Sequence, residues 1–319
     1  MRLLALLALV PVVVASAASA FDLQGHRGAR GLVPENTLPA FARALAIGVT
    51  TLEFDTGITL DDYVVIAHDR RLNPDITRGL DDAWITSPGP LIRELSLAAL
   101  KRYDVGAIRP ETAYAKSFPR QEAMPGLRMP TLRELVALTQ TQGATSVRFN
   151  IETKISPLAP AETLAPEPFA QLLIAEIRRL GIAARSSVQS FDWRTLAIVA
   201  REAPEIARVY LTIEQGRGET IGKGKGVSPW TGLDATAHGN STPRVVHGAG
   251  GRIWSPFFRD LNAESVADAK RLGLAIVPWT VNEPDDMRRV VGLGVDGLIT
   301  DYPDRARVIL AEAGITPAR

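Results

Sequence analysis

The sequence predicts an α/β protein whose strands and helices alternate in a closed (β/α)8 barrel of the TIM type. Short apolar segments alternate with amphipathic helical segments along the chain, which is typical of a parallel sheet. Eight strand–helix units can be counted, and 319 residues leave room for a barrel of about 250. No glycine-rich dinucleotide fingerprint follows an early strand, which disfavours an open doubly wound sheet.

Each predicted strand is a short run of apolar or β-branched residues that ends in a polar group or a turn. The strands are expected at residues 21–25, 50–59, 63–66, 147–151, 187–191, 208–212, 251–255, 274–280 and 297–300. The segment 63–66 is expected to fold back on its predecessor as a hairpin, because Asp61 and Asp62 form a turn signal between them. The other segments are the barrel strands.

The predicted helices have apolar residues on one face and capping residues at their ends. They are expected from Thr37 to Gly48, near 97–103, from Thr131 to Gly143, at 169–180, after Asp192, after Asn262, at 285–293 and from about Pro303. Two segments are expected to be irregular. Residues 78–128 are interpreted as an insertion between the hairpin and the third barrel strand. The glycine-rich residues 216–250 are interpreted as a mobile loop, either without a role or acting as a lid over the site.

The first twenty residues have the pattern of a secretory signal peptide. Arg2 precedes an apolar run, and the small residues Ala18, Ser19 and Ala20 form a cleavage signal. The apolar run is short for a membrane anchor, because a spanning helix needs about 20 residues. We therefore expect 1–20 to be removed, 21–319 to form one domain, and the protein to be exported to the periplasm or secreted.

Composition excludes several classes of protein. The chain has 36 Lys and Arg against 35 Asp and Glu, a balance that argues against a nucleic-acid partner. It has no cysteine, so disulfides, thiolate metal sites and Cys nucleophiles are excluded. No later segment is apolar enough to span a membrane, so no stable membrane insertion is expected after signal cleavage. No feature indicates a protein partner.

Acidic residues gather where two predicted barrel strands end. Glu53 and Asp55 alternate with Phe54, so their side chains share one face of a strand, and Glu152 ends the next barrel strand. Carboxyl ends of barrel strands meet at the active-site face. Three crowded carboxylates need a cation, or their pKa values must rise. Oxygen ligands without cysteine suit Ca²⁺ or Mg²⁺, whereas the alternative is a structural ion-pair network with Arg27 and Lys154.

Two of the four histidines flank this acidic cluster. His26 follows the first strand and His68 follows the hairpin. Imidazoles give and take protons near neutral pH. A divalent cation, Arg27, Lys154 and two proton carriers fit an anionic phosphoryl group and favour cleavage of an ester over simple binding. His238 and His247 lie in the glycine-rich segment and receive no role.

Taken together, these motifs resemble the glycerophosphodiester phosphodiesterases. The matching blocks run in that family's order and are HRGARGLVPENTLPAF (26–41), LEFDTGITLDDYVVIAHD (52–69), LSLAALKRYDVG (95–106), MPTLRELV (129–136), IETK (151–154), VQSFD (188–192), VPWTVN (277–282) and DGLITDYP (296–303). They cover nearly the whole mature chain, and the family fold is the same (β/α)8 barrel.

The resemblance implies a role for each residue of the cluster. Glu53, Asp55 and Glu152 would hold one divalent cation, Ca²⁺ or Mg²⁺, and His26 and His68 would be the catalytic acid–base pair. Arg27 and Lys154 would bind the phosphate of a small glycerophosphodiester, and Trp279 would wall the glycerol or alcohol moiety. The alternative for Trp279 is packing within the barrel.

The implied reaction is hydrolysis of a glycerophosphodiester to glycerol 3-phosphate and an alcohol, through a cyclic phosphate. Two alternatives remain open at this point. Related barrels cleave intact or lyso-phospholipids, as phospholipases of the C or D type do. A non-catalytic barrel that binds phosphorylated ligands would not need two proton carriers.

Overall fold

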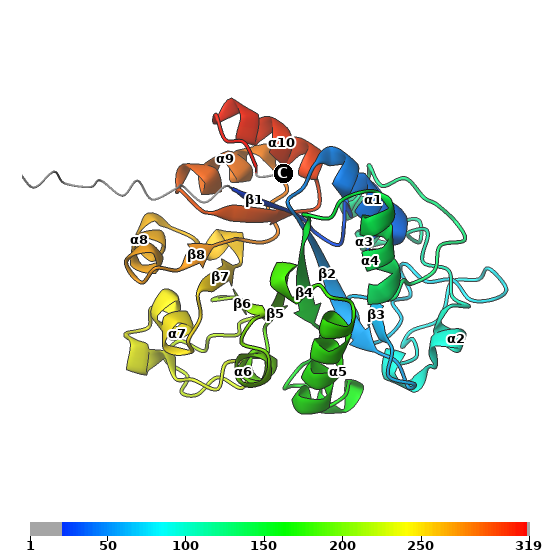
Figure 1. Cartoon of the computed structure of the whole chain (residues 1–319), viewed down its shortest axis with the longest axis horizontal. Coiled ribbons are helices and arrows are strands. Elements are labelled where there is room, and N and C mark those ends of the chain that lie inside the picture. The colour runs from blue at the N-terminus through cyan, green and yellow to red at the C-terminus, as the bar shows by residue number, and fades with distance from the viewer. Residues whose placement is uncertain (1–20, 318–319) are drawn as a thin grey trace, which may run out of the picture.

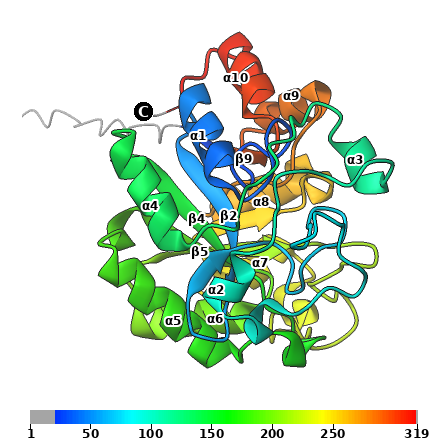
Figure 2. The ribbon, with the colours of Figure 1, turned by 90° about the vertical axis from the view of Figure 1, so that its right-hand side faces the viewer.

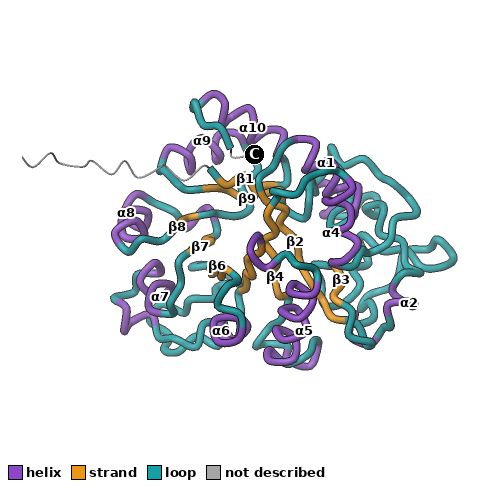
Figure 3. Tube along the Cα trace, viewed as in Figure 1, coloured by secondary structure: helices purple, strands orange, loops and turns teal. Residues whose placement is uncertain are grey.

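Eight parallel strands curve into a nearly closed barrel that is surrounded by helices (Figures 1 and 3), so the predicted fold class is confirmed. This computed structural model describes residues 21–317, and the predicted signal peptide lies outside the described residues. The strands are β1 (Asp22–Gly25), β2 (Thr51–Ile58), β3 (Val64–Ile66), β4 (Arg148–Thr153), β5 (Ser186–Ser190), β6 (Ala207–Thr212), β7 (Ile253–Pro256), β8 (Ala275–Ile276) and β9 (Gly297–Thr300). Strand β3 pairs antiparallel with β2, as the hairpin prediction required.

The barrel strands pair in the order β8-β7-β6-β5-β4-β2-β1-β9. Strands β8 and β9 close the ring through single backbone hydrogen bonds. The amide of Asp296 donates to the carbonyl of Ile276 at 2.9 Å, and the amide of Ile299 donates to that of Pro278 at 2.9 Å. Every carboxyl end therefore lies at one mouth of the barrel, which is where polar residues of different strands can meet.

Ten helices are present among the described residues. They are α1 (Leu38–Ile47), α2 (Leu97–Leu100), α3 (Ala113–Ser117), α4 (Leu132–Thr141), α5 (Pro166–Arg179), α6 (Trp193–Glu202), α7 (Thr242–Gly248), α8 (Ala263–Arg271), α9 (Pro284–Gly292) and α10 (Pro303–Glu312). The capping signals hold: Thr37, Thr131, Asp192 and Asn262 each accept a backbone N–H at the start of a helix. Gly48 ends α1 at φ 89°, a left-handed conformation that glycine adopts without a Cβ penalty.

The register of β2 and β4 aligns the acidic residues. Asp55 lies opposite Glu152, and Glu53 lies opposite Asn150. Phe54, between the two acids, points the other way and packs edge-on against Phe41 of α1 at 5.8 Å. Burial of Phe54 beneath the helices thus fixes which face of β2 carries its carboxylates.

Polar side chains fill part of the barrel interior. The amide of Asn150 donates to Gln24 on β1 and to Gln189 on β5, each at 2.9 Å, and Gln189 in turn donates to Glu53 at 2.5 Å. Asn150 and Gln189 are both buried. Because buried polar groups are stable only when their hydrogen bonds are made, this chain of amides orients the Glu53 carboxylate from below.

Three expected segments differ from the structure. Residues 216–250 are not a loop throughout, since they contain a short 3-10 helix (Ala235–His238) and α7. The strand expected at 274–280 is regular only at β8. The amides of Val277 and Trp279 still donate to Trp254 and Pro256 of β7, at 2.9 and 3.1 Å, but Pro278 between them has no N–H to donate. The helix expected near 97–103 is the single turn α2.

The insertion, residues 78–128, packs on an apolar cluster of its own beside the hairpin. That cluster is Val65, Ala67, Leu72, Ile92, Leu100, Val105 and Met129. Besides α2, the insertion contains a 3-10 turn (Ile92–Glu94) and α3, neither of which was expected. Within residues 21–317, no helix combines the length and apolarity that crossing a membrane requires.

Candidate active site

A pocket of about 160 Å³ opens at the carboxyl ends of the barrel strands. It brings together seven of the eight predicted site residues, which are His26, Arg27, Glu53, His68, Glu152, Lys154 and Trp279. The eighth, Asp55, is buried next to it and pairs with Lys154 and Arg27. The rule that strand ends meet at the barrel mouth therefore predicted the charged residues and histidines of this set, whereas Trp279 was predicted from the family resemblance.

The three predicted metal ligands converge on one point. Glu53, Asp55 and Glu152 each offer a carboxylate oxygen, and these oxygens all lie within 4.8 Å of one another. Oxygens on opposite sides of a calcium ion lie up to about 5 Å apart, so this spacing suits one shared cation.

The hydrogen bonding of the acids also fits a cation. Oδ1 of Asp55 is buried and accepts no hydrogen bond from the described residues. Glu53 accepts only neutral donors, the backbone N–H of Arg27 at 3.0 Å and the Gln189 amide. Among the described residues, no Lys or Arg side chain forms an ion pair with Glu53. A buried carboxylate without a cationic partner calls for an ion or for protonation.

Electrostatics within the cluster agree with this. Burial and the neighbouring charges of Asp55 and Glu152 raise the pKa of Glu53 well above its usual range. Burial, together with Asp55, raises the pKa of Glu152 to about 7. Burial opposes ionisation of Asp55 as well, but the Arg27 guanidinium keeps the pKa of Asp55 far below its usual range. The raised pKa values of Glu53 and Glu152 mean that these carboxyl groups hold protons in the absence of a metal ion. A bound metal ion would take the place of those protons.

His26 is held by a buried carboxylate. Its Nδ1–H donates to Oδ1 of Asp301 at 2.6 Å, so Nε2 faces Glu53 at 3.9 Å. Burial and the positive charge of Arg30 lower the pKa of His26 to about 4, even though Asp301 opposes the shift. The imidazole is therefore neutral at pH 7 and has a free lone pair directed into the pocket.

His68 has a similar arrangement on the opposite side. Its Nδ1 lies 2.8 Å from Oδ1 of Asp69, and the other oxygen of Asp69, Oδ2, accepts a hydrogen bond from the Asn73 amide at 2.8 Å. Burial and the charge of Arg27 lower the pKa of His68. Two histidines, each oriented by an aspartate, thus face one pocket, and neither Nε2 atom forms a hydrogen bond with a carboxylate of the described residues.

The two predicted phosphate-binding cations form ion pairs with the acids. Nζ of Lys154 lies 2.7 Å from Glu152 and 3.6 Å from Asp55, and Nε of Arg27 lies 3.2 Å from Asp55. Arg27 follows β1 with φ 49°, an uncommon conformation for a residue with a Cβ, and this turn points its N–H at Glu53. The cations and acids therefore form one charged network at the mouth.

Aromatic rings form the other wall of the pocket. Trp279 packs edge-on against Phe191 with ring centroids 5.2 Å apart and lies 5.6 Å from Phe257. Trp230, from the glycine-rich segment, continues this wall at 6.5 Å from Phe191. Trp279 is only partly buried, so it both packs in the barrel and presents a face to the pocket.

Four residues at the site were not predicted: Asp301, Arg30, Gln189 and Phe191. Asp301 follows the last strand, β9, so the rule applied to the other strand ends would have found it. Gln189 lies on β5 and Phe191 directly follows this strand, whereas the predicted site residues come from the ends of other strands. Arg30 lies in the turn after β1 and carries no signal in the sequence.

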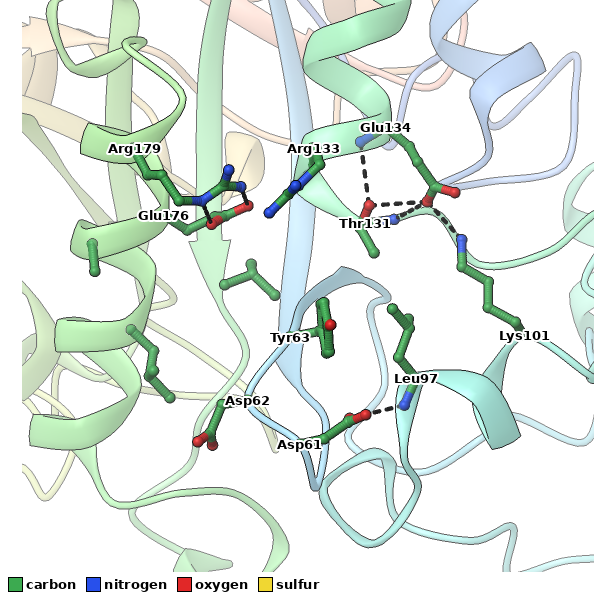
Figure 4. Close-up of a pocket in the computed structure, with 13 residues that line it drawn as sticks. Asp61, Asp62, Tyr63, Leu97, Lys101, Thr131, Arg133, Glu134, Glu176 and Arg179 are labelled. Carbon is green, nitrogen blue, oxygen red and sulfur yellow. Dashed lines mark hydrogen bonds and ion pairs between the residues drawn. The ribbon is translucent and has the colours of Figure 1, made fainter.

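A larger cavity, about 530 Å³, lies away from these residues. It is formed by the hairpin turn at 61–64 and the outer faces of α4 and α5. Figure 4 shows that four of its charged groups form two pairs, Lys101 with Glu134 and Arg179 with Glu176. It holds none of the predicted catalytic groups.

The chain is similar to known proteins over most of its length. The model of the glycerophosphoryl diester phosphodiesterase family matches residues 26–305. A curated glycerophosphodiester phosphodiesterase of Caldanaerobacter subterraneus subsp. tengcongensis is 28% identical over 290 residues, which is 91% of this chain and 97% of that protein.

Solved structures show the same barrel. A crystal structure from Silicibacter pomeroyi DSS-3, provisionally named a glycerophosphoryl diester phosphodiesterase, is 36% identical with a TM-score of 0.83, covering 94% of this chain and 96% of that one. An Oleispira antarctica phosphodiesterase, solved in complex with the product sn-glycerol-3-phosphate, shares the fold at 20% identity and a TM-score of 0.65, covering 91% and 96%.

Proposed function

Since the chain belongs to the glycerophosphoryl diester phosphodiesterase family, we propose that it hydrolyses glycerophosphodiesters to glycerol 3-phosphate and an alcohol at the pocket described above. The observation that carries the proposal is the convergence of Glu53, Asp55 and Glu152 between two histidines that are each held by an aspartate. Simple binding of a phosphorylated ligand would not need two oriented proton carriers.

Charge in the pocket is arranged for a phosphodiester. Glu53, Asp55 and Glu152 would hold a divalent cation, which, when bound, neutralises charge on the phosphoryl oxygens. Arg27 and Lys154 would bind the remaining phosphoryl oxygen atoms, because both lie beside the acids at the pocket wall. Burial of these groups strengthens their interaction with the substrate relative to water.

The two histidines would move the protons. Nε2 of His26 takes the proton of a glycerol hydroxyl, whose oxygen forms a bond to phosphorus as the bond to the alcohol oxygen breaks. His68, protonated at Nε2 when the substrate is bound, gives that proton to the departing alcohol. Water then opens the cyclic phosphate, with His68 as base and His26 as acid. Attack by a hydroxyl of the same substrate benefits from proximity, and Asp301 fixes the tautomer that leaves Nε2 of His26 free.

The aromatic wall would hold the uncharged part of the substrate. Trp279 and Phe191 line the same pocket as Arg27 and pack edge-on against each other. Ring faces pack against the carbon atoms of glycerol or of an alcohol and exclude water from the reacting bond. Trp279 would therefore contribute to binding rather than to proton transfer.

The decisive experiment is a panel of glycerophosphodiesters assayed with purified protein in defined Ca²⁺ or Mg²⁺. Release of glycerol 3-phosphate from glycerophosphocholine supports the proposal. Exclusive turnover of a lysophospholipid would favour a phospholipase instead. His26→Ala and His68→Ala should each abolish turnover while leaving the fold intact, and full activity in either variant would refute the acid–base roles.

Export is a separate proposal. The composition of residues 1–20 supports a cleaved signal peptide, with the mature chain starting at Phe21. N-terminal sequencing of the protein recovered from the periplasm or the medium tests this. A chain recovered with residues 1–20 attached would contradict it.

A further inference from the structure

The insertion reaches the charged groups of the pocket through one short helix, α3. Figure 2 shows α3 at the right-hand edge of the view, on the opposite side from α4. Tyr114 of α3 and Phe118, the residue that directly follows the helix, pack with their rings edge-on and their centroids 5.1 Å apart. The guanidinium of Arg30 lies 4.6 Å from the centre of the Phe118 ring, a cation–π contact.

Hydrogen bonds dock the segment after α3 onto the turn that follows β1. The side-chain amide of Gln121 donates to the carbonyl of Arg30 at 2.7 Å. The backbone amide of Glu122 donates to the carbonyl of Leu32 at 2.9 Å. The insertion is therefore fixed to the same turn that carries His26 and Arg27.

On one side, Tyr114 contacts the phosphate-binding arginine through a carboxylate. Its hydroxyl donates a short hydrogen bond to Oε2 of Glu35. The other oxygen of Glu35 accepts from Nη1 of Arg27 at 2.8 Å. Nε of Arg27 in turn lies 3.2 Å from Oδ2 of Asp55, a predicted metal ligand. Glu35 and Arg27 are both buried, so these bonds are shielded from solvent.

On the other side, the same hydroxyl accepts from an arginine that holds the partner of His26. Nη1 of Arg30 lies 3.4 Å from the Tyr114 hydroxyl. Arg30 also donates two hydrogen bonds to Asp301, at 2.7 and 2.9 Å. Asp301 accepts from His26 at 2.6 Å. The Tyr114 hydroxyl is thus linked to His26 on one side and to Arg27 on the other.

We propose that Tyr114 is a positioning residue for the reaction, supplied by the insertion, which holds Glu35 and Arg30 so that Arg27 and His26 keep their places in the pocket. This inference rests on the proposed function and extends it to a segment outside the barrel. In this proposal the insertion helps to hold the catalytic groups in place.

Burial makes the hydroxyl hard to replace. Glu35 uses one carboxylate oxygen for Arg27 and the other for Tyr114. Without the hydroxyl, a buried carboxylate oxygen loses its donor, and water has little access because Glu35 is 7% exposed. Glu35 is then expected to rotate toward the remaining donors, Arg27 and Arg30, and to draw Arg27 from the phosphoryl position.

The test is Tyr114→Phe, which removes only the oxygen and keeps the ring contacts with Phe118 and Arg30. Tyr103→Phe is the matched control, because Tyr103 lies in the insertion but packs on the separate apolar cluster. For Tyr114→Phe we expect kcat/KM to fall roughly ten- to hundredfold, since small displacements of positioned groups cost rates of this size. The inhibition constant of inorganic phosphate should rise severalfold, and the thermal midpoint should stay close to that of Tyr103→Phe.

A double-mutant cycle with Glu35→Gln separates positioning from a general loss of stability. If Tyr114 acts through Glu35, the double variant loses little more than the more impaired single variant. Fully additive losses, or a Tyr114→Phe enzyme with kcat/KM within twofold of wild type, would overturn the proposal. If the wild type turns over none of the diesters, the proposed function fails, and Tyr114 is judged on phosphate binding by calorimetry. Equal phosphate affinity in wild type and Tyr114→Phe would then overturn it.

Discussion

Asp301→Asn tests the proton-transfer geometry most directly. The substitution keeps the size of the side chain but removes the charge that accepts the Nδ1–H of His26 at 2.6 Å. Asp301 is fully buried, and Arg30 and His26 keep its pKa far below its usual range although burial opposes this, so it is ionised at every working pH. The neutral amide can no longer stabilise the imidazolium that forms when His26 accepts a proton.

The expected loss follows from the strength of this contact. A hydrogen bond to a charged group contributes about 1.5–3 kcal/mol, and each 1.4 kcal/mol changes a rate about tenfold. We therefore expect kcat to fall roughly 10- to 150-fold. If the new amide turns its NH2 toward His26, the proton moves to Nε2 and the base is blocked. A change of tautomer costs about 10⁴-fold in the serine-protease triad, which sets the upper limit.

The assay measures kcat for release of glycerol 3-phosphate at saturating metal, alongside the thermal midpoint. Asp192→Asn is the control, because Asp192 is an equally buried aspartate that pairs with Arg194 and caps α6 outside the pocket lining. The control should lose stability but little kcat. A kcat for Asp301→Asn within about threefold of wild type, in a folded protein, would refute the view that Asp301 orients His26.

Four further outcomes are expected. Chelation should abolish turnover, and Ca²⁺ or Mg²⁺ should restore it; undiminished activity after verified metal removal would favour a purely structural ion-pair network. Because burial and Asp55 raise the pKa of Glu152 to about 7, the metal must displace a proton below that pH. The affinity of the site for the divalent cation should therefore rise between about pH 6 and about pH 8. The proton released on metal binding can be measured by calorimetry in buffers of different ionisation enthalpy. Trp279→Ala should raise KM severalfold with a smaller effect on kcat, and an unchanged KM would show that the ring only packs in the barrel. Phe54→Ala should lower the free energy of unfolding by about 3–5 kcal/mol in denaturant titrations, since Phe54 is fully buried between Phe41 and Phe149.

The barrel and its acidic cluster could be predicted because both depend on local periodicity. Alternation along β2 places Glu53 and Asp55 on one face and Phe54 on the other, and the register with β4 then brings Glu152 opposite Asp55. Capping residues such as Thr131 mark helix starts within a few residues, because the cap hydrogen bond is itself local. These signals need no knowledge of distant contacts.

The segments that were missed lack such signals. Helix α7 lies in a stretch rich in glycine, yet Val245 and Val246 are buried against the barrel, so tertiary packing outweighs the weak local preference. Strand β8 is regular over only two residues because Pro278 has no N–H to donate, although Val277 and Trp279 on either side of it still bond to β7. The apolar run suggests a longer regular strand. Helix α3 has five residues, too few for a periodic pattern to be recognised.

The support of the catalytic groups depends on contacts between distant parts of the chain. Asp301 lies 275 residues from His26, and Tyr114 lies 79 residues from Glu35. A sequence shows which residues can donate or accept protons, but the pairing of these groups follows from the closure of the barrel and the docking of the insertion. The residues proposed to contact the substrate could thus be named from motifs, while the residues that hold them in place required the fold. For this reason Asp301 and Tyr114, rather than the acidic cluster, are the positions at which mutagenesis would teach most about how this barrel works.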